Sequence, residues 1–72
     1  MDSQERGELV RRLFALMTAK LEDAAFEAME GQGAHQDNSG QIARAERIEL
    51  IARDVGVLAE SAAAILRDRA ET

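Results

Sequence analysis

The sequence feature that most constrains this chain is an apolar seam in its second half. Its members recur at alternating steps of three and four residues: Ile48, Ile51, Val55, Leu58, Ala62 and Ile65. A repeat of about 3.5 residues keeps one stripe of a helix facing a partner helix along its length. The spacing therefore predicts one long helix over about residues 39–70, packed along this seam.

The first half of the chain carries a second seam with the same period. Its members are Val10, Phe14, Met17, Leu21, Ala24 and Ala28. Asp2 is a favourable helix N-cap, and Glu5 follows it at the spacing of a capping box. The pattern predicts a helix over about residues 3–30.

A short glycine-containing segment separates the two predicted helices. Gly31-Gln32-Gly33 should end the first helix, because glycine accepts the left-handed conformation found at many helix ends. Asp37, Asn38 or Ser39 can cap the second helix. A loop of about residues 31–38 places the helices side by side and antiparallel. The predicted fold class is therefore all-α, a two-helix hairpin forming a single domain over residues 1–72.

The two seams together predict the core of the hairpin. We assign to this core Val10, Phe14, Met17, Leu21, Ile48, Ile51, Val55, Leu58, Ala62 and Ile65. More apolar residues remain than one helical pair can bury. Some of them form a row beside the seam of the first helix. Others form a row on the second helix, about 130° around the helix from the centre of its seam.

These extra rows predict that the hairpin dimerises. Seventy-two residues are near the lower limit for a chain that folds alone, and the sequence has no cysteine for disulfide stabilisation. Two hairpins can form a symmetric four-helix bundle, which is a common solution for short chains. The predicted homodimer interface contains Leu9, Leu13, Leu16, Leu50 and Val57.

Charge and hydropathy exclude several classes of partner. The formal net charge is −5, which argues against nucleic-acid binding because phosphate contacts need clustered Lys and Arg. The longest strongly apolar run, residues 13–17, is far shorter than the roughly 20 residues of a membrane span. No charged and apolar leader opens the chain. We expect a cytoplasmic protein without membrane association.

The sequence contains no convincing catalytic or metal-ligating set. His35 is the single histidine, and a zinc site requires three or four ligands. The serines lie at predicted helix starts or mid-helix, without a glycine-flanked nucleophile turn. We therefore expect no enzymatic activity, no metal and no cofactor.

Residues 51–65 contain a small residue at Ala52, a glycine four positions later at Gly56, and spaced apolar residues beyond. This pattern resembles the helix-turn-helix of bacterial DNA-binding regulators. The resemblance implies that Ala52 packs between two helices, that Gly56 forms the turn, and that residues 59–64 begin the recognition helix. Leu58, however, occupies the place where that family usually has a polar cap.

Two functions follow from these observations. The unbroken seam favours a small non-enzymatic protein-protein interaction or regulatory protein that works as a homodimeric helical bundle. Such a protein could also bind an unidentified protein partner. The alternative is a small helix-turn-helix DNA-binding transcriptional regulator that uses residues 48–66. Glu60, Ser61 and Ala63 would form its reading surface, and none of them is a typical reader of base edges.

Overall fold

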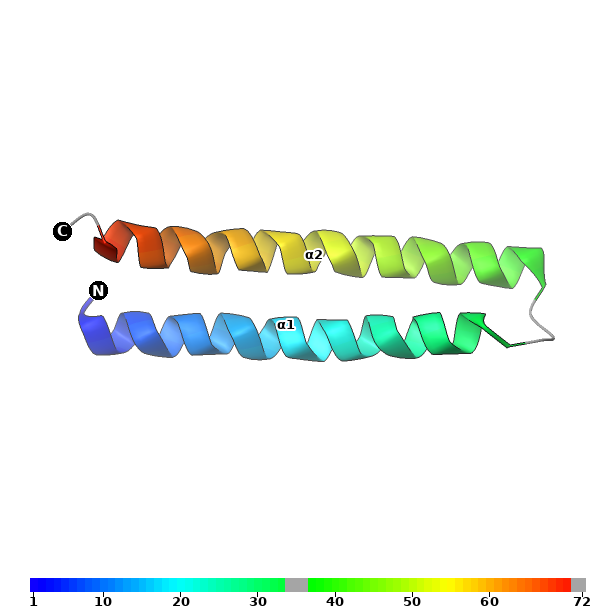
Figure 1. Cartoon of the computed structure of the whole chain (residues 1–72), viewed down its shortest axis with the longest axis horizontal. Helices are drawn as coiled ribbons and strands as arrows, with labels where there is room; N and C mark the ends of the chain where they lie inside the picture. The colour runs from blue at the N-terminus through cyan, green and yellow to red at the C-terminus, as the bar shows by residue number, and fades with distance from the viewer. Residues whose placement is uncertain (34–36, 71–72) are drawn as a thin grey trace.

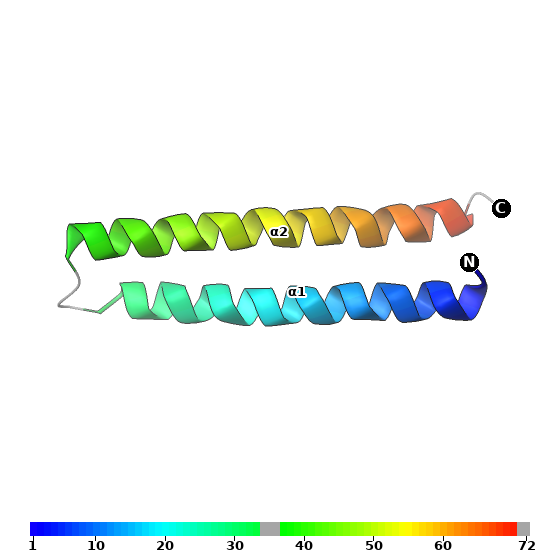
Figure 2. The same ribbon diagram turned by 180° about the vertical axis from the view of Figure 1, so that it is seen from behind.

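The computed structural model describes residues 1–33 and 37–70, with side chains described up to residue 68. It contains two helices, α1 (Ser3–Gly31) and α2 (Asn38–Ala70). They lie side by side and antiparallel along a rod that measures 55 × 15 × 13 Å (Figures 1 and 2). The prediction of an all-α hairpin is confirmed, and both helices begin and end within one residue of their predicted limits. His35 lies outside the described residues.

Aspartate side chains cap both helices at their N-termini. The Oδ1 atom of Asp2 accepts a hydrogen bond from the Glu5 backbone N–H at 2.7 Å, and Oδ1 of Asp37 accepts one from the Gly40 N–H at 2.7 Å. Each bond satisfies a donor that has no partner within its helix. The predicted cap at Asp2 is confirmed, and among the three candidates for α2 the structure selects Asp37.

The C-terminus of α1 differs from the expected left-handed glycine cap. No described glycine has a positive φ. Instead, the backbone N–H groups of Gln32 and Gly33 donate to the carbonyls of Met29 and Glu30, each at 3.2 Å. These tighter bonds to the third preceding residue satisfy the last carbonyls without a change of handedness.

The seam between the helices follows the 3–4 spacing on both sides. On α1 its half-buried or buried members are Arg6, Val10, Leu13, Met17, Lys20, Ala24 and Glu27; on α2 they are Arg44, Ile48, Ile51, Val55, Leu58, Ala62 and Ile65. Among the described residues only Val10, Met17 and Ala62 are buried. A two-helix rod has little interior, so most of this seam stays partly open to solvent.

On α1 the seam is displaced by one residue from part of the predicted core. Phe14 and Leu21 were assigned to the core, but they are 54% and 53% exposed. Leu13 and Lys20 are half-buried in their place. A lysine can occupy such a position because its aliphatic stem covers apolar surface while its ammonium group reaches solvent. The six residues assigned to the core on α2 are all half-buried or buried.

Neither helix, over its described residues, has an apolar stretch of the length that a membrane crossing requires.

Candidate functional site

Uncovered apolar surface is the main candidate for a functional feature of this hairpin. The large hydrophobic residues that are exposed are Met1, Phe14, Leu16, Leu21, Phe26, Met29, Ile42, Leu50, Val57 and Leu66. A large exposed apolar surface on a small protein marks a site of interaction. Their positions relative to the seam place Phe14, Leu21 and Leu66 on one side of the rod and Leu16, Leu50 and Val57 on the opposite side.

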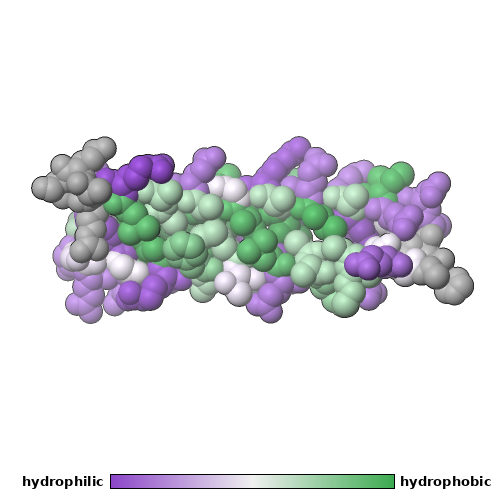
Figure 3. Space-filling model, viewed as in Figure 1, coloured by the Kyte–Doolittle hydropathy of each residue, from purple (hydrophilic) through white to green (hydrophobic). Residues whose placement is uncertain are grey.

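One side, which we call the front face, is formed by the residues that directly follow seam residues 6, 13, 20 and 27 on α1 and 44, 51, 58 and 65 on α2. In two antiparallel helices these positions fall on the same side of the pair. The front face therefore contains Gly7, Phe14, Leu21 and Ala28 from α1, and Ala45, Ala52, Ala59 and Leu66 from α2. None of the eight is charged. Figure 3 shows this side as an apolar band along the rod, bordered by hydrophilic residues.

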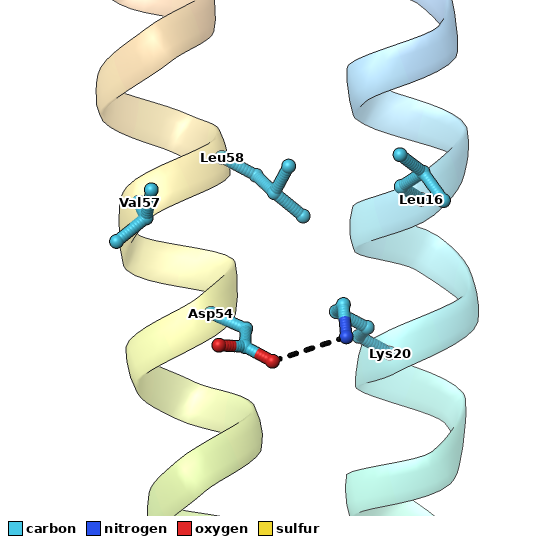
Figure 4. A pocket seen from close by; sticks show the side chains of 5 residues that line it. All are labelled: Leu16, Lys20, Asp54, Val57 and Leu58. Atoms are coloured by element: carbon cyan, nitrogen blue, oxygen red, sulfur yellow. Dashed lines mark hydrogen bonds and ion pairs between the residues drawn. The ribbon is translucent and has the colours of Figure 1, made fainter.

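The opposite side, which we call the back face, carries Leu16 on α1 and Leu50 and Val57 on α2. Leu16 and Val57 line a shallow pocket of about 220 Å³ together with Lys20, Asp54 and Leu58 (Figure 4). The Nζ atom of Lys20 lies 3.1 Å from Oδ2 of Asp54 at its edge. The pocket is open to solvent and contains no arrangement of an acid, a base and a nucleophile.

The structure places the residues of the predicted dimer interface in different parts of the hairpin. Leu9 and Leu13 are half-buried, and Leu13 belongs to the seam within the hairpin. Leu16, Leu50 and Val57 are exposed and lie on the back face. Sequence reasoning treated Phe14 and Leu21 as core residues, so it missed the front face. The signal was present: the position after every second seam residue, counted from residue 6 on α1 and residue 44 on α2, is uncharged.

Charged residues join the two helices near the loop end of the rod. The Oε1 atom of Glu27 accepts a hydrogen bond from Arg44 at 2.6 Å, and its Oε2 atom accepts one from Nε of Arg47 at 2.9 Å. Only 18% of the Glu27 side chain is exposed. The hydrogen bond from Arg47 is the main cause that lowers the pKa of Glu27, with further contributions from the positive charges of Arg47 and Arg44. This cluster fixes the alignment of α1 against α2.

Helix α2 passes through Gly56 without interruption. The glycine does not have a positive φ. Residues 48–66 therefore form one continuous helix, whereas the resemblance to a helix-turn-helix implied a turn at Gly56. A helix-turn-helix needs two helices joined at a large angle to place one of them in the DNA groove.

The part of the chain that the structure describes has no group of three or more His, Cys, Asp or Glu side chains able to hold a metal ion. Comparisons with models of protein families, with curated proteins and with solved structures found no significant match.

Proposed function

We propose that this chain is a small non-enzymatic interaction or regulatory protein that acts as a homodimeric four-helix bundle. One observation carries the proposal. The described residues include three buried side chains and ten exposed large hydrophobic ones. A chain of this size gains stability by covering such surface with a partner.

The simplest partner is a second hairpin. Four antiparallel helices enclose a common core, and each helix then buries a wider apolar stripe than a single neighbour can cover. A homodimer also needs no other gene product, and two-fold symmetry is the commonest arrangement of soluble oligomers.

Light scattering coupled to size exclusion tests this proposal directly. At chain concentrations of about tens of micromolar, in the range where modest dimers are populated, the expected mass is twice the 7.9 kDa of one chain. Circular dichroism on the same samples should show a helical protein. A folded, monodisperse monomer at these concentrations would contradict the proposed assembly.

We also propose that the protein acts in the cytoplasm and without binding nucleic acid. Among the described side chains, four arginines lie outside the inter-residue ion pairs: Arg6, Arg11, Arg12 and Arg67. Neighbouring acids such as Glu5, Glu8 and Asp68 offset their positive charge. Duplex DNA should therefore bind no tighter than the non-specific range of about 10⁻⁴ to 10⁻⁶ M. Sequence-specific retention at nanomolar protein would favour the regulator instead.

A further inference from the structure

The two exposed faces of the hairpin are unequal as candidates for the bundle core. Helices that face the core of a four-helix bundle are apolar at seam positions and at one flanking position, about three residues in seven. On both helices of this chain the flanking position that carries no charged residue is the one on the front face. The two wide stripes therefore converge on a single side of the hairpin.

Burying the back face in the core of a bundle would be energetically unfavourable. Its flanking positions are Leu9, Leu16, Asp23 and Glu30 on α1, and Arg47, Asp54, Ser61 and Asp68 on α2. Covering this side would remove several charges from water, and such burial costs free energy unless each charge is paired with good geometry. Leu50 and Val57 point further from the seam than these charged residues, so they lie toward the edge of that surface.

The dimensions of the front face suit a dimer interface. Seen from this side the whole rod measures 55 by 15 Å, a projected area of about 800 Å², so two copies that cover each other along their full length would bury about 1,600 Å². That is the usual size of a stable, specific interface. We propose that a second copy of this chain covers the front face with its loop at the opposite end of the rod, so that Phe14 of each copy packs against Leu21 of the other. This inference rests on the proposed homodimeric function.

The register of the hairpin supports a two-fold axis across the middle of the rod. The front-face row of α1 is centred midway between Phe14 and Leu21, and that of α2 midway between Ala52 and Ala59. The contact of Lys20 with Asp54, at 3.1 Å, and those of Glu27 with Arg44 and Arg47 place these two centres level with each other. A two-fold axis level with both centres therefore places the front-face row of α1 over the same row of the second copy, running in the opposite direction. It does the same for the row of α2, as an isologous interface requires.

The charge distribution selects the orientation of the second copy. Residues 20–54, which form the half of the rod that contains the loop, carry eight acids and four bases, a net charge of −4. The other half carries six acids and five bases, a net charge of −1. Placing the loops at the same end would bring the two −4 halves together. With the loops at opposite ends, each −4 half lies over a −1 half, which reduces the repulsion.

Two leucines on α1 provide a matched test of the face. Leu21 on the front face is 53% exposed and Leu16 on the back face is 51% exposed. We expect Leu21→Glu to weaken dimerisation by at least about 10-fold, since it places a charge in the apolar interface. Leu16→Glu should change the dissociation constant by less than about threefold. Sedimentation equilibrium measures both, and circular dichroism verifies that each variant remains helical.

The reverse ranking of these two variants would assign the interface to the back face and overturn the inference. Equal, small effects in a protein that still dimerises would also overturn it. If the unaltered chain is a monomer, the proposed function itself fails, which separates that outcome from a wrong choice of face.

A spin-label experiment tests the orientation in a chain whose front face is unaltered. The sequence has no cysteine, so Gln32→Cys gives one labelling site per chain near the loop end. With loops at opposite ends, the rise of 1.5 Å per residue places the two labels about 45 Å apart. With loops at the same end, the spacing of packed helices places them within about 20 Å. Pulsed electron paramagnetic resonance distinguishes these distances, and the short one would overturn the proposed orientation.

Discussion

The Glu27 carboxylate on α1 lies 2.6 Å from a guanidinium nitrogen of Arg44 on α2, and Arg47 contacts the same carboxylate at 2.9 Å. One acid therefore connects to two positions on the opposite helix, close to where the chain turns. Gln41 adds a third link, because its Nε2 donates to the Gly31 carbonyl at 3.1 Å. At this end the seam is formed by Glu27 and Arg44 and not by large apolar side chains, so polar contacts help to hold the helices in register.

The lowered pKa of Glu27 predicts a pH-dependent contribution to stability. Because the folded-state pKa lies below its ordinary value of 4.5, the contribution is present above that value and disappears as the pH falls through the folded pKa. Glu27→Gln should lower the melting temperature at about pH 7, and the difference from the unaltered protein should shrink toward about pH 3. Thermal melts followed by circular dichroism across this range measure it.

Glu49 provides the control for this pH experiment. Its ion pair with Arg53 is also 2.9 Å long, but it lies within one helix and both side chains are more than half exposed. Glu49→Gln should shift the melting temperature little, because exposed pairs of this type contribute only about 0.3–0.5 kcal/mol. Equal effects of the two substitutions would show that Glu27 does not link the helices energetically.

The ion pair between Lys20 and Asp54 should contribute less than an apolar contact at the same position. Lys20 is half-buried in the seam, whereas 61% of the Asp54 side chain is exposed, so water can solvate the aspartate once its partner is removed. Lys20→Leu should therefore stabilise the hairpin by about 0.5–1.5 kcal/mol through added burial. Chemical denaturation measures the change, and Arg53→Leu, at an exposed site, should show no such gain.

The sequence predicted which segments are helical more reliably than which stripe of α1 faces α2. Capping residues and the 3–4 spacing are local signals, so the helices, their limits and the α2 seam could be predicted. On α1 two overlapping stripes share Val10, Met17 and Ala24. Phe14 and Leu21 make one of them more apolar, yet the structure uses Leu13 and Lys20. Periodicity identifies an apolar stripe but does not say which partner covers it.

Ala62 is the most enclosed residue of the described chain, with 2% of its surface exposed. Its small side chain allows the helices to approach closely at this level. Ala62→Leu should therefore destabilise the fold by about 1–3 kcal/mol, since the added atoms must force the helices apart. Ala64, two positions later, is exposed. Ala64→Leu should stay within about 0.5 kcal/mol of the unaltered protein in the same denaturation experiment.

Gly56 distinguishes the continuous helix from the helix-turn-helix. Apart from its two chain neighbours and the adjacent backbone of α2, a Cβ atom added at this position would meet no atom within 4 Å, and the backbone is helical without a positive φ. A glycine inside a helix costs about 0.5–1 kcal/mol relative to alanine, because it loses more backbone freedom on folding. Gly56→Ala should therefore raise stability by about that amount per chain, which for a chain of this size raises the melting temperature by several degrees.

In a helix-turn-helix the same substitution would have the opposite sign, because alanine is strained at a turn that needs a positive φ. The melt should be paired with a measurement of mass, since Gly56 lies close to the proposed two-fold axis. A lower melting temperature together with loss of the dimer would show that the second copy approaches too closely at Gly56 to admit a methyl group. A lower melting temperature with the dimer intact would contradict a continuous α2. That result would restore the DNA-binding alternative, because the turn at Gly56 is the feature that a reading helix in residues 59–64 requires.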